Sequence, residues 1–391
     1  MEEVYLVDFV RTAFSRARPT EPERDAFNSM RMDQALGQLI GQAVSRNRIP
    51  AESIGDVITG CALQMDENWL YGGRHPVLLA GLPVSVPGVG MDRACASSMN
   101  AAAVGALEIM TGHSDVVLAG GMEHMTHVPM SGNPHMAPNM RLLLRPEYAR
   151  YQLSVGYTMG LTAEKLAEES GIGRQEMDEY SLESHRRAAK ATEDGWLRGE
   201  IMPVEVEQGV VVAEDQSIRK DTTLEQLSKL PPAFKQGGVV TAGNSSPLNS
   251  GASLLVLASG RKVEEYGLRP LARVVSFGWA GVEPSLMGKG PVPATKKALK
   301  KGGLTEDRVD LWEINEAFAV VVLNAAAEFG LDLSKVNVKG GAIAIGHPLG
   351  ASGARIMGTL ARQLRDTGKE YGVATLCVGG GQGYAAVLQR P

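Results

Sequence analysis

The sequence predicts an α/β fold in which one arrangement of strands and helices occurs twice and is interrupted by an inserted segment. Three observations support this. Apolar strand patterns alternate with amphipathic helix patterns up to Gly121, the alternation stops at Met122 and resumes near Thr241, and the same order of patterns returns after Arg269. The regular alternation favours a mainly parallel sheet. A chain of 391 residues is long enough for two such domains and an insertion.

The first repeat is predicted from apolar runs and from apolar residues at helical spacing. The expected strands cover residues 4–10, 54–59 and 115–121, and the expected helices cover residues 32–47, 66–79 and 96–110. A short extended segment, 84–89, precedes the last of these helices. The strand at 115–121 has a continuous apolar run, so we expect it to be buried on both faces.

The middle of the chain, from Met122 to about Thr241, is predicted to hold loops and two helices, 162–170 and 174–195, with few sheet strands. Methionine is enriched at its start, which indicates either an adaptable apolar wall or ordinary core. The start also contains a group of potential metal ligands, namely Glu123, His124, His127 and His135. Their spacing fits no common zinc pattern, so we predict no metal site.

The second repeat begins after a strand at 253–259 and a helix at 261–266. Segments 271–277, 293–302, 311–314, 352–365 and 373–381 correspond in order to elements of the first repeat. We therefore expect an N-terminal core domain of residues 1–121 and 242–268, an inserted domain of residues 122–241, and a C-terminal core domain of residues 269–391.

Composition excludes several classes of protein. The formal net charge of −5 argues against non-specific nucleic-acid binding, which requires a basic face. The acidic N-terminal segment matches no signal peptide, and no apolar run approaches the length of a membrane span. Only three cysteines occur, Cys61, Cys95 and Cys377, which is typical of a reducing compartment. We predict a cytoplasmic protein.

Cys95 lies among small residues where a helix pattern begins, so it is predicted at a strand-to-helix turn. Free N–H groups at a helix start favour a thiolate, and small neighbours leave room for a substrate carbonyl. A buried structural cysteine is the alternative interpretation.

A duplicated fold brings equivalent turns together near its pseudo-twofold axis, so Cys95 is expected near His347. Asn315 and Cys377 also follow predicted strands, where ligands gather in α/β sheets. A histidine on a turn can take the proton of a cysteine nucleophile near pH 7. The three glycines that follow Val378 allow backbone N–H groups to face a ligand.

Four segments, 93–99, 315–318, 341–350 and 376–381, together resemble the thiolases, and the similarity extends from Val4 to Leu388. The resemblance implies the thiolase fold: two duplicated core domains stacked in five α-β-α-β-α layers, with an inserted loop domain that covers the active site. Asn315 together with a second cysteine separates thiolases from decarboxylating ketoacyl synthases, which use two histidines beside their cysteine.

The resemblance also implies catalytic roles in a ping-pong thiolytic cleavage of 3-ketoacyl-CoA. Cys95 attacks the keto carbon and holds the acyl group as a thioester. His347 activates Cys95 and then the thiol of coenzyme A, while Cys377 protonates the departing acetyl-CoA enolate. Asn315, through a water, forms one oxyanion site with His347, and the backbone N–H groups of Cys95 and Gly379 form the other.

Coenzyme A enters this scheme as a co-substrate, and the resemblance implies no permanently bound cofactor. Arg219 is expected at the nucleotide end of coenzyme A and Ser246 at the pantetheine arm. Met159, Met287 and Phe318 are expected to line the thioester pocket.

Thr158 stands where biosynthetic acetoacetyl-CoA thiolases have a histidine, which favours a degradative enzyme similar to the thiolase subunit of bacterial fatty-acid oxidation complexes. A biosynthetic acetyl-CoA acetyltransferase and a non-catalytic acyl-CoA-binding scaffold are the alternatives, and the intact cysteine, asparagine and histidine set argues against the scaffold. The resemblance further implies a homodimer or tetramer and a hydratase/dehydrogenase partner subunit.

Two segments depart from the family. Segment 249–252 is expected to alter a helix start, because it contains Ser250 where the family usually has aspartate. Segment 142–150 has no clear counterpart, so its three leucines either contact a partner or fold inward as core.

Overall fold

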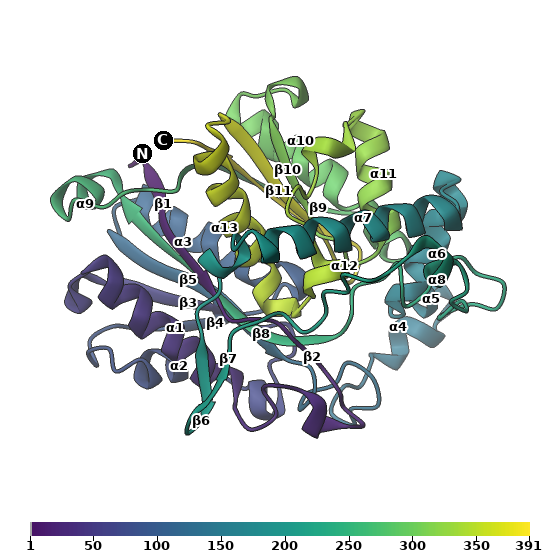
Figure 1. Ribbon diagram of the computed structural model, residues 1–391, viewed down its shortest axis with the longest axis horizontal. Helices are drawn as coiled ribbons and strands as arrows, with labels where there is room; N and C mark the ends of the chain where they lie inside the picture. The colour runs from purple at the N-terminus through teal and green to yellow at the C-terminus, as the bar shows by residue number, and fades with distance from the viewer. Residues whose placement is uncertain (1) are drawn as a thin grey trace.

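The computed structural model describes residues 2–391, and a large mixed sheet in the order β10-β11-β12-β9-β1-β8-β5-β3-β4 runs through it (Figure 1). One half of the sheet contains β1 (Val4–Arg11), β8 (Asn249–Ser259), β5 (Val116–His124) and β3 (Asp56–Gly60). The other half contains β9 (Ala272–Gly281), β12 (Gln382–Gln389), β11 (Tyr371–Val378) and β10 (Leu311–Ile314). Starting from the β1–β9 junction, each half has two antiparallel pairings and then a parallel one. The predicted duplication is confirmed by this equivalence.

The predicted mainly parallel sheet is wrong. Among the pairings between the strands that the structure describes, only β3–β5, β10–β11 and the pairing of β3 with β4 (Val89–Met91) are parallel. The continuous apolar pattern that suggested parallel strands is equally suitable for antiparallel strands buried on both faces. Strand β8 shows this, because all of its residues are buried and both of its main neighbours are antiparallel to it.

Two helices lie between the halves of the sheet. Helix α13 (Leu349–Thr367) is buried at every residue from Leu349 to Leu364, and it packs against α3 (Ser97–Met110) and against strands of both halves. Helix α1 (Met32–Asn47) covers the outer face of the first half, while α10 (Pro291–Gly302) covers that of the second. The resulting order of helix, sheet, helix, sheet and helix is the predicted layering.

The remaining core elements are β2 (Ser15–Arg16), α2 (Arg74–Leu79), α9 (Gly260–Glu265), α11 (Ala319–Phe329) and α12 (Ala342–Ile345). The helix predicted over 66–79 is wrong in its first half. Tyr71, Gly72 and Gly73 have φ angles of 49°, 63° and 80°, which an α-helix cannot include, so α2 begins only at Arg74. The extended segment predicted at 84–89 is also wrong, since a turn precedes β4 there.

The segment between β5 and β8 carries α4 (Met140–Leu144), α5 (Leu153–Gly156), α6 (Met159–Ser170), α7 (Arg174–Glu193) and α8 (Leu224–Ser228), together with a hairpin of β6 (Val204–Glu207) and β7 (Val210–Val212). In Figure 1, α4, α5, α6 and α8 gather on the right of the view and α7 crosses in front of the central helices. Leu144 is 73% exposed, so it does not fold inward with the core.

No helix within residues 2–391 combines the length and the apolar character needed to cross a membrane.

Candidate active site

Cys95 lies on a 3-10 turn, Ala94–Ala96, between β4 and α3, as predicted for a strand-to-helix turn. Ala94 has a φ of 44°, an unusual value for a residue with a side chain, and this bends the chain sharply before the cysteine. Cys95 is a free thiol that is half-buried, and it packs against an apolar group that includes Ala17, Met125 and Leu349.

Three of the five predicted catalytic residues meet at the Cys95 sulfur. The backbone N–H groups of Gly379 and of Cys95 itself face this sulfur. Cys377, a buried residue at the end of β11, lies close enough that a negative charge on Cys95 raises the pKa of the Cys377 thiol. The turn after β11 makes this approach possible, because Gly380 and Gly381 adopt φ angles of 79° and 80° that glycine tolerates.

Asn315 and His347 form the second part of the site. Asn315 follows β10, and its backbone N–H donates to the carbonyl oxygen of Thr375 at 2.9 Å. Its Nδ2 lies 3.4 Å from Nε2 of His347, and its Oδ1 is buried without a hydrogen-bond partner among the described residues. A buried amide oxygen without a partner is costly, which favours a water or substrate group at this position.

The hydrogen bonds around His347 define its tautomer. The hydroxyl of Ser352 donates to the carbonyl oxygen of Pro348 at 2.8 Å, so its oxygen accepts a hydrogen bond from Nδ1–H of His347 at 2.6 Å. Nε2 therefore carries no proton and faces Asn315. The backbone N–H of His347 donates to Oδ1 of Asn249 at 2.8 Å.

Burial dominates the electrostatics of this site. It raises the pKa of the Cys95 thiol to about 11, although the N–H of Gly379 opposes the shift. Burial, with a smaller contribution from Arg355, lowers the pKa of His347 to about 3. Backbone N–H groups do favour the thiolate, as expected, since those of Gly379 and Cys95 lower the pKa of the thiol, but desolvation is the larger effect. Cys95 and His347 are both neutral near pH 7.

The predicted thioester-pocket residues lie beside this centre. Met159, Met287 and Phe318 belong to the same apolar cluster as Cys377. The sulfur of Met159 lies 3.8 Å from the position that a Cβ atom on Gly379 would occupy. An apolar wall made of residues from the inserted segment and from the second half therefore lies beside Gly379.

The two residues predicted to bind the rest of coenzyme A lie farther out. Ser246 is half-buried, and its backbone N–H donates to the carbonyl oxygen of Ala317 at 3.0 Å, next to the Asn315–Phe318 segment. Arg219 is exposed, and its backbone N–H donates to Nδ1 of His185 at 3.1 Å. Arg219 therefore lies at the protein surface and not among the buried catalytic residues.

Comparison with known proteins agrees with this geometry. Residues 4–261 match the family model described as thiolase, N-terminal domain, and residues 268–390 match thiolase, C-terminal domain. The chain belongs to the thiolase family. It is 43% identical to a 3-ketoacyl-CoA thiolase of Marinobacter nauticus over 99% of this chain and 98% of that protein, and 42% identical to one of Vibrio vulnificus over the full length of both.

Solved structures give the same result. The crystal structure of human mitochondrial 3-ketoacyl-CoA thiolase in complex with CoA superposes with a TM-score of 0.86 at 37% identity, covering 100% of this chain and 98% of that one. The similarity covers both halves of the molecule, so the thiolase fold extends through the whole chain.

Several residues that support this thiolase site were not recognised from the sequence. Glu123 is fully buried and accepts hydrogen bonds from the backbone N–H groups of Ala62, Leu63 and Gly350 at 2.9 to 3.0 Å. Gly350 belongs to the first turn of α13, so Glu123 anchors the helix that follows His347. An isolated acidic residue in the apolar strand β5 was the available signal. Burial raises the pKa of Glu123 to about 7.

Ser352 and Asn249, which position His347, were also missed. Ser352 lies five positions after His347 in the first turn of α13, a spacing that could have been noticed. The segment 249–252 forms the start of strand β8 and not a helix start, so that expectation is wrong. Ser250 there donates to Oδ2 of Asp25 at 2.9 Å.

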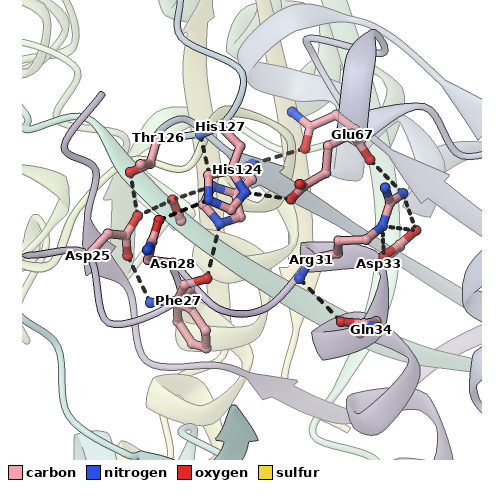
Figure 2. Close-up of polar contacts among 12 residues, drawn as sticks. Asp25, Phe27, Asn28, Arg31, Asp33, Gln34, Glu67, His124, Thr126 and His127 are labelled. Carbon is pink, nitrogen blue, oxygen red and sulfur yellow. Dashed lines mark hydrogen bonds and ion pairs between the residues drawn. The ribbon is translucent and has the colours of Figure 1, made fainter. Parts of the chain in front are cut away.

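Figure 2 shows that two of the predicted potential metal ligands, His124 and His127, lie together with Glu67. The two imidazole rings stack with centroids 3.8 Å apart and planes only 9° apart, so their in-plane lone pairs cannot converge on one ion. Their nitrogen atoms also have hydrogen-bond partners, including Glu67 at 2.8 Å and the carbonyl oxygen of Phe27 at 3.2 Å. The cluster joins three loops and is poorly suited to bind a metal.

Proposed function

We propose that this thiolase cleaves 3-ketoacyl-CoA with coenzyme A and releases acetyl-CoA and a shortened acyl-CoA, as a step of fatty-acid β-oxidation. The proposal depends chiefly on one observation: the Cys95 sulfur faces the backbone N–H of Gly379 and lies close to the thiol of Cys377. The relatives compared above are named 3-ketoacyl-CoA thiolases, which supports a degradative enzyme.

In the first half-reaction the neutral Cys95 thiol gives its proton to Nε2 of His347 as the sulfur attacks the keto carbon. The backbone N–H groups of Cys95 and Gly379 face that sulfur and stabilise the oxyanion on the attacked carbon. The bond between the α and keto carbons then breaks. Cys377 protonates the α carbon of the departing acetyl-CoA enolate, whose thioester oxygen is held by Asn315, through a water, and by His347. The proton on Nε2 of His347 then passes to the Cys377 thiolate, so both groups are neutral again.

In the second half-reaction His347 takes the proton of the coenzyme A thiol, and the thiolate attacks the acyl group on Cys95. The bond between the acyl group and the Cys95 sulfur then breaks, and the Cys95 thiolate regains its proton from His347. Each half-reaction begins with proton transfer to a neutral imidazole, which is the state that the low pKa of His347 favours. Because the thioester keeps the acyl group activated, the reaction is reversible. Coenzyme A is a co-substrate, and no resident cofactor takes part.

In this proposal the bound substrate extends from the protein surface to the catalytic residues. Arg219 contacts the nucleotide end of coenzyme A and Ser246 contacts the pantetheine arm. Met159, Met287 and Phe318 surround the thioester. The domain division follows the same scheme, with core domains of residues 1–121 plus 242–268 and 269–391, and with residues 122–241 covering the active site.

We also propose that the chain forms a homodimer through β4. This strand ends the order of the sheet among residues 2–391, so its outer edge is unpaired. Large apolar side chains are exposed beside it, with exposed fractions of 53% for Trp69, 63% for Tyr71 and 83% for Val84. A second copy of the chain can pair with β4 and cover these side chains. Tetramer formation, a hydratase/dehydrogenase partner subunit and a cytoplasmic location are further parts of the proposal.

Steady-state thiolysis of a chain-length series of 3-ketoacyl-CoA substrates tests the function. Activity on chains longer than acetoacetyl-CoA supports the degradative enzyme. Activity on acetoacetyl-CoA alone would favour a biosynthetic acetyl-CoA acetyltransferase, and no activity across the series would favour a non-catalytic scaffold.

A further inference from the structure

Four arginines gather where β2 meets the segment that precedes α8. Arg16 is the last residue of β2, and its backbone N–H donates to Oε1 of Gln216 at 3.0 Å. The pKa of Arg16 is lowered by its partial burial and by the positive charges of Arg18, Arg219 and Arg24, in that order. The positive charges of these guanidinium groups therefore repel one another.

Three of these arginines lack an acidic partner. Arg24 pairs with Glu21 at 2.7 Å, but Arg16, Arg18 and Arg219 form no ion pair in the part of the chain that the structure describes. Nε of Arg18 is buried and has no hydrogen-bond partner there. Nearby Arg11 provides the contrast, because it is paired with both Glu200 and Asp215. An unpaired group of like charges is destabilising by itself and creates a site for a polyanion.

The arginine cluster borders the active site. The side chain of Asn249 accepts from the backbone N–H of His347 at 2.8 Å and donates to the carbonyl oxygen of Ser15 at 2.8 Å and to Oγ of Ser217 at 3.2 Å. One amide thus joins the catalytic turn to the two segments that carry Arg16 and Arg219. Ala17, between Arg16 and Arg18, packs in the same apolar group as Cys95.

We propose that Arg16 and Arg18, together with Arg219, bind the phosphate groups of coenzyme A and of the acyl-CoA substrate. This inference rests on the proposed function. Guanidinium groups form paired, charge-assisted hydrogen bonds with phosphate oxygens, and neutralising the cluster removes the repulsion. Coenzyme A presents phosphate at two places, the diphosphate and the ribose 3′-phosphate, so several arginines can engage one ligand. An acidic protein surface is the competing occupant, and normal binding of coenzyme A by a folded cluster variant in the test below would favour it.

The test compares the dissociation constants of three probes, coenzyme A, 3′-dephospho-coenzyme A and pantetheine, for the wild type and for the Arg16→Gln/Arg18→Gln variant. We expect the variant to bind coenzyme A at least about tenfold more weakly, as for the loss of one charge-assisted hydrogen bond, and to bind pantetheine unchanged. Weakening for coenzyme A alone assigns the arginines to the 3′-phosphate. Equal weakening for coenzyme A and its 3′-dephospho form assigns them to the diphosphate.

An Arg48→Gln/Lys300→Gln variant is the matched control, since it removes the same charge from two exposed positions outside the cluster. It should bind all three probes like the wild type. The proposal is overturned if the cluster variant keeps its melting temperature and binds coenzyme A normally. It is also overturned if the dissociation constant for pantetheine rises by the same factor as that for coenzyme A. If the double variant does not fold, the single variants Arg16→Gln and Arg18→Gln are measured in the same way.

The binding measurement does not require turnover, so the two proposals fail separately. A wild type that cleaves 3-ketoacyl-CoA, with arginine variants that bind coenzyme A normally, contradicts only the phosphate site. A wild type that binds coenzyme A through the arginines but cleaves no substrate contradicts only the proposed function.

Discussion

The two halves of the molecule differ in the length of the connection between two equivalent strands. In the first half, residues 125–248 lie between β5 and β8 and carry α4 to α8. In the second half, the equivalent strands β11 and β12 are joined by residues 379–381 alone. The long connection supplies apolar side chains such as Met159, and the short one supplies the N–H of Gly379 to the Cys95 sulfur. The duplicated core places both connections at one site, and their lengths determine what each contributes.

The turns before the central helices differ in a similar way. The turn before α3 carries Cys95 after Ala94, whose φ is 44°, while the turn before α13 carries His347 after Gly346, whose φ is 121°. Equivalent positions thus hold the predicted nucleophile and the predicted base. The duplicated fold therefore places the two turns close together, and different residues on the two turns divide the predicted chemistry between the halves.

The largest effect is expected at the turn of the first half. Cys95→Ser should lower turnover by about 10⁴-fold or more, because the hydroxyl is a far weaker nucleophile and the remaining site cannot replace it. The measurement is steady-state thiolysis, with circular dichroism to show that the variant is folded. Cys61→Ser, at another buried cysteine of the same half, should keep most of the activity. Substantial turnover by Cys95→Ser would show that the first half does not supply the nucleophile.

Asn315 tests the contribution of the second half. Asn315→Ala should lower kcat by roughly 10²–10³-fold, the usual effect of removing one oxyanion donor, while the KM for coenzyme A changes little. Asn324→Ala, at a buried asparagine of α11, is the control and should retain kcat. A rise in KM alone, with kcat unchanged, would show that Asn315 contributes only to substrate binding and not specifically to the transition state.

The pH dependence of Cys95 alkylation tests whether the proton of Cys95 has already moved to His347 in the free enzyme. A pKa of about 11 means that the thiol form dominates below that pH, so the rate should rise about tenfold per pH unit and be about a hundredfold lower at pH 9 than its limit. Iodoacetamide labelling followed by peptide mass analysis gives the rate. A plateau already reached below pH 8 would indicate a preformed ion pair with His347.

The smallest effect is expected at the short connection. A Cβ on Gly379 would make only ordinary contacts, 3.7 Å to Cβ of Ala94 and 3.8 Å to the sulfur of Met159, so Gly379→Ala should change the free energy of unfolding by less than about 0.5 kcal/mol. Gly121→Ala, in β5, would place Cβ 2.2 Å from the carbonyl oxygen of Gly350 and should cost more than about 3 kcal/mol. Denaturant unfolding compares them, and equal stabilities would contradict the packing described.

The duplication and many elements could be predicted from sequence because they depend on local patterns. The helix at residues 32–47 and the strand at residues 311–314 are predicted with their observed bounds. The direction of strand pairing could not be predicted, because buried parallel and antiparallel strands share one pattern. The break before α2 was also missed, since it depends on positive φ angles at Tyr71 and its two following glycines.

The catalytic residues could be named from motifs, but their environment depends on contacts between distant residues. Asn249 holds His347 across 98 positions of sequence, and Glu123 holds Gly350 across 227. The rise in the pKa of Cys95 could not be predicted, because its desolvation depends on neighbours from both halves, including Leu349. Arg219 was recognised through the family motif, whereas Arg16 became a candidate only when the structure placed it beside Arg219.

Identifying the residue that carries the acyl group is the most direct test of the proposed division of chemistry between the two halves. The Cys377→Ala variant is mixed with an acyl-CoA, digested and examined by peptide mass spectrometry. Acylation from a thioester needs Cys95 and His347 but no proton transfer at the α carbon, so we predict that the Cys95 peptide carries the acyl group while the variant cannot cleave 3-ketoacyl-CoA. An acyl group on Cys61, or unimpaired cleavage by Cys377→Ala, would contradict the division of chemistry between the two halves.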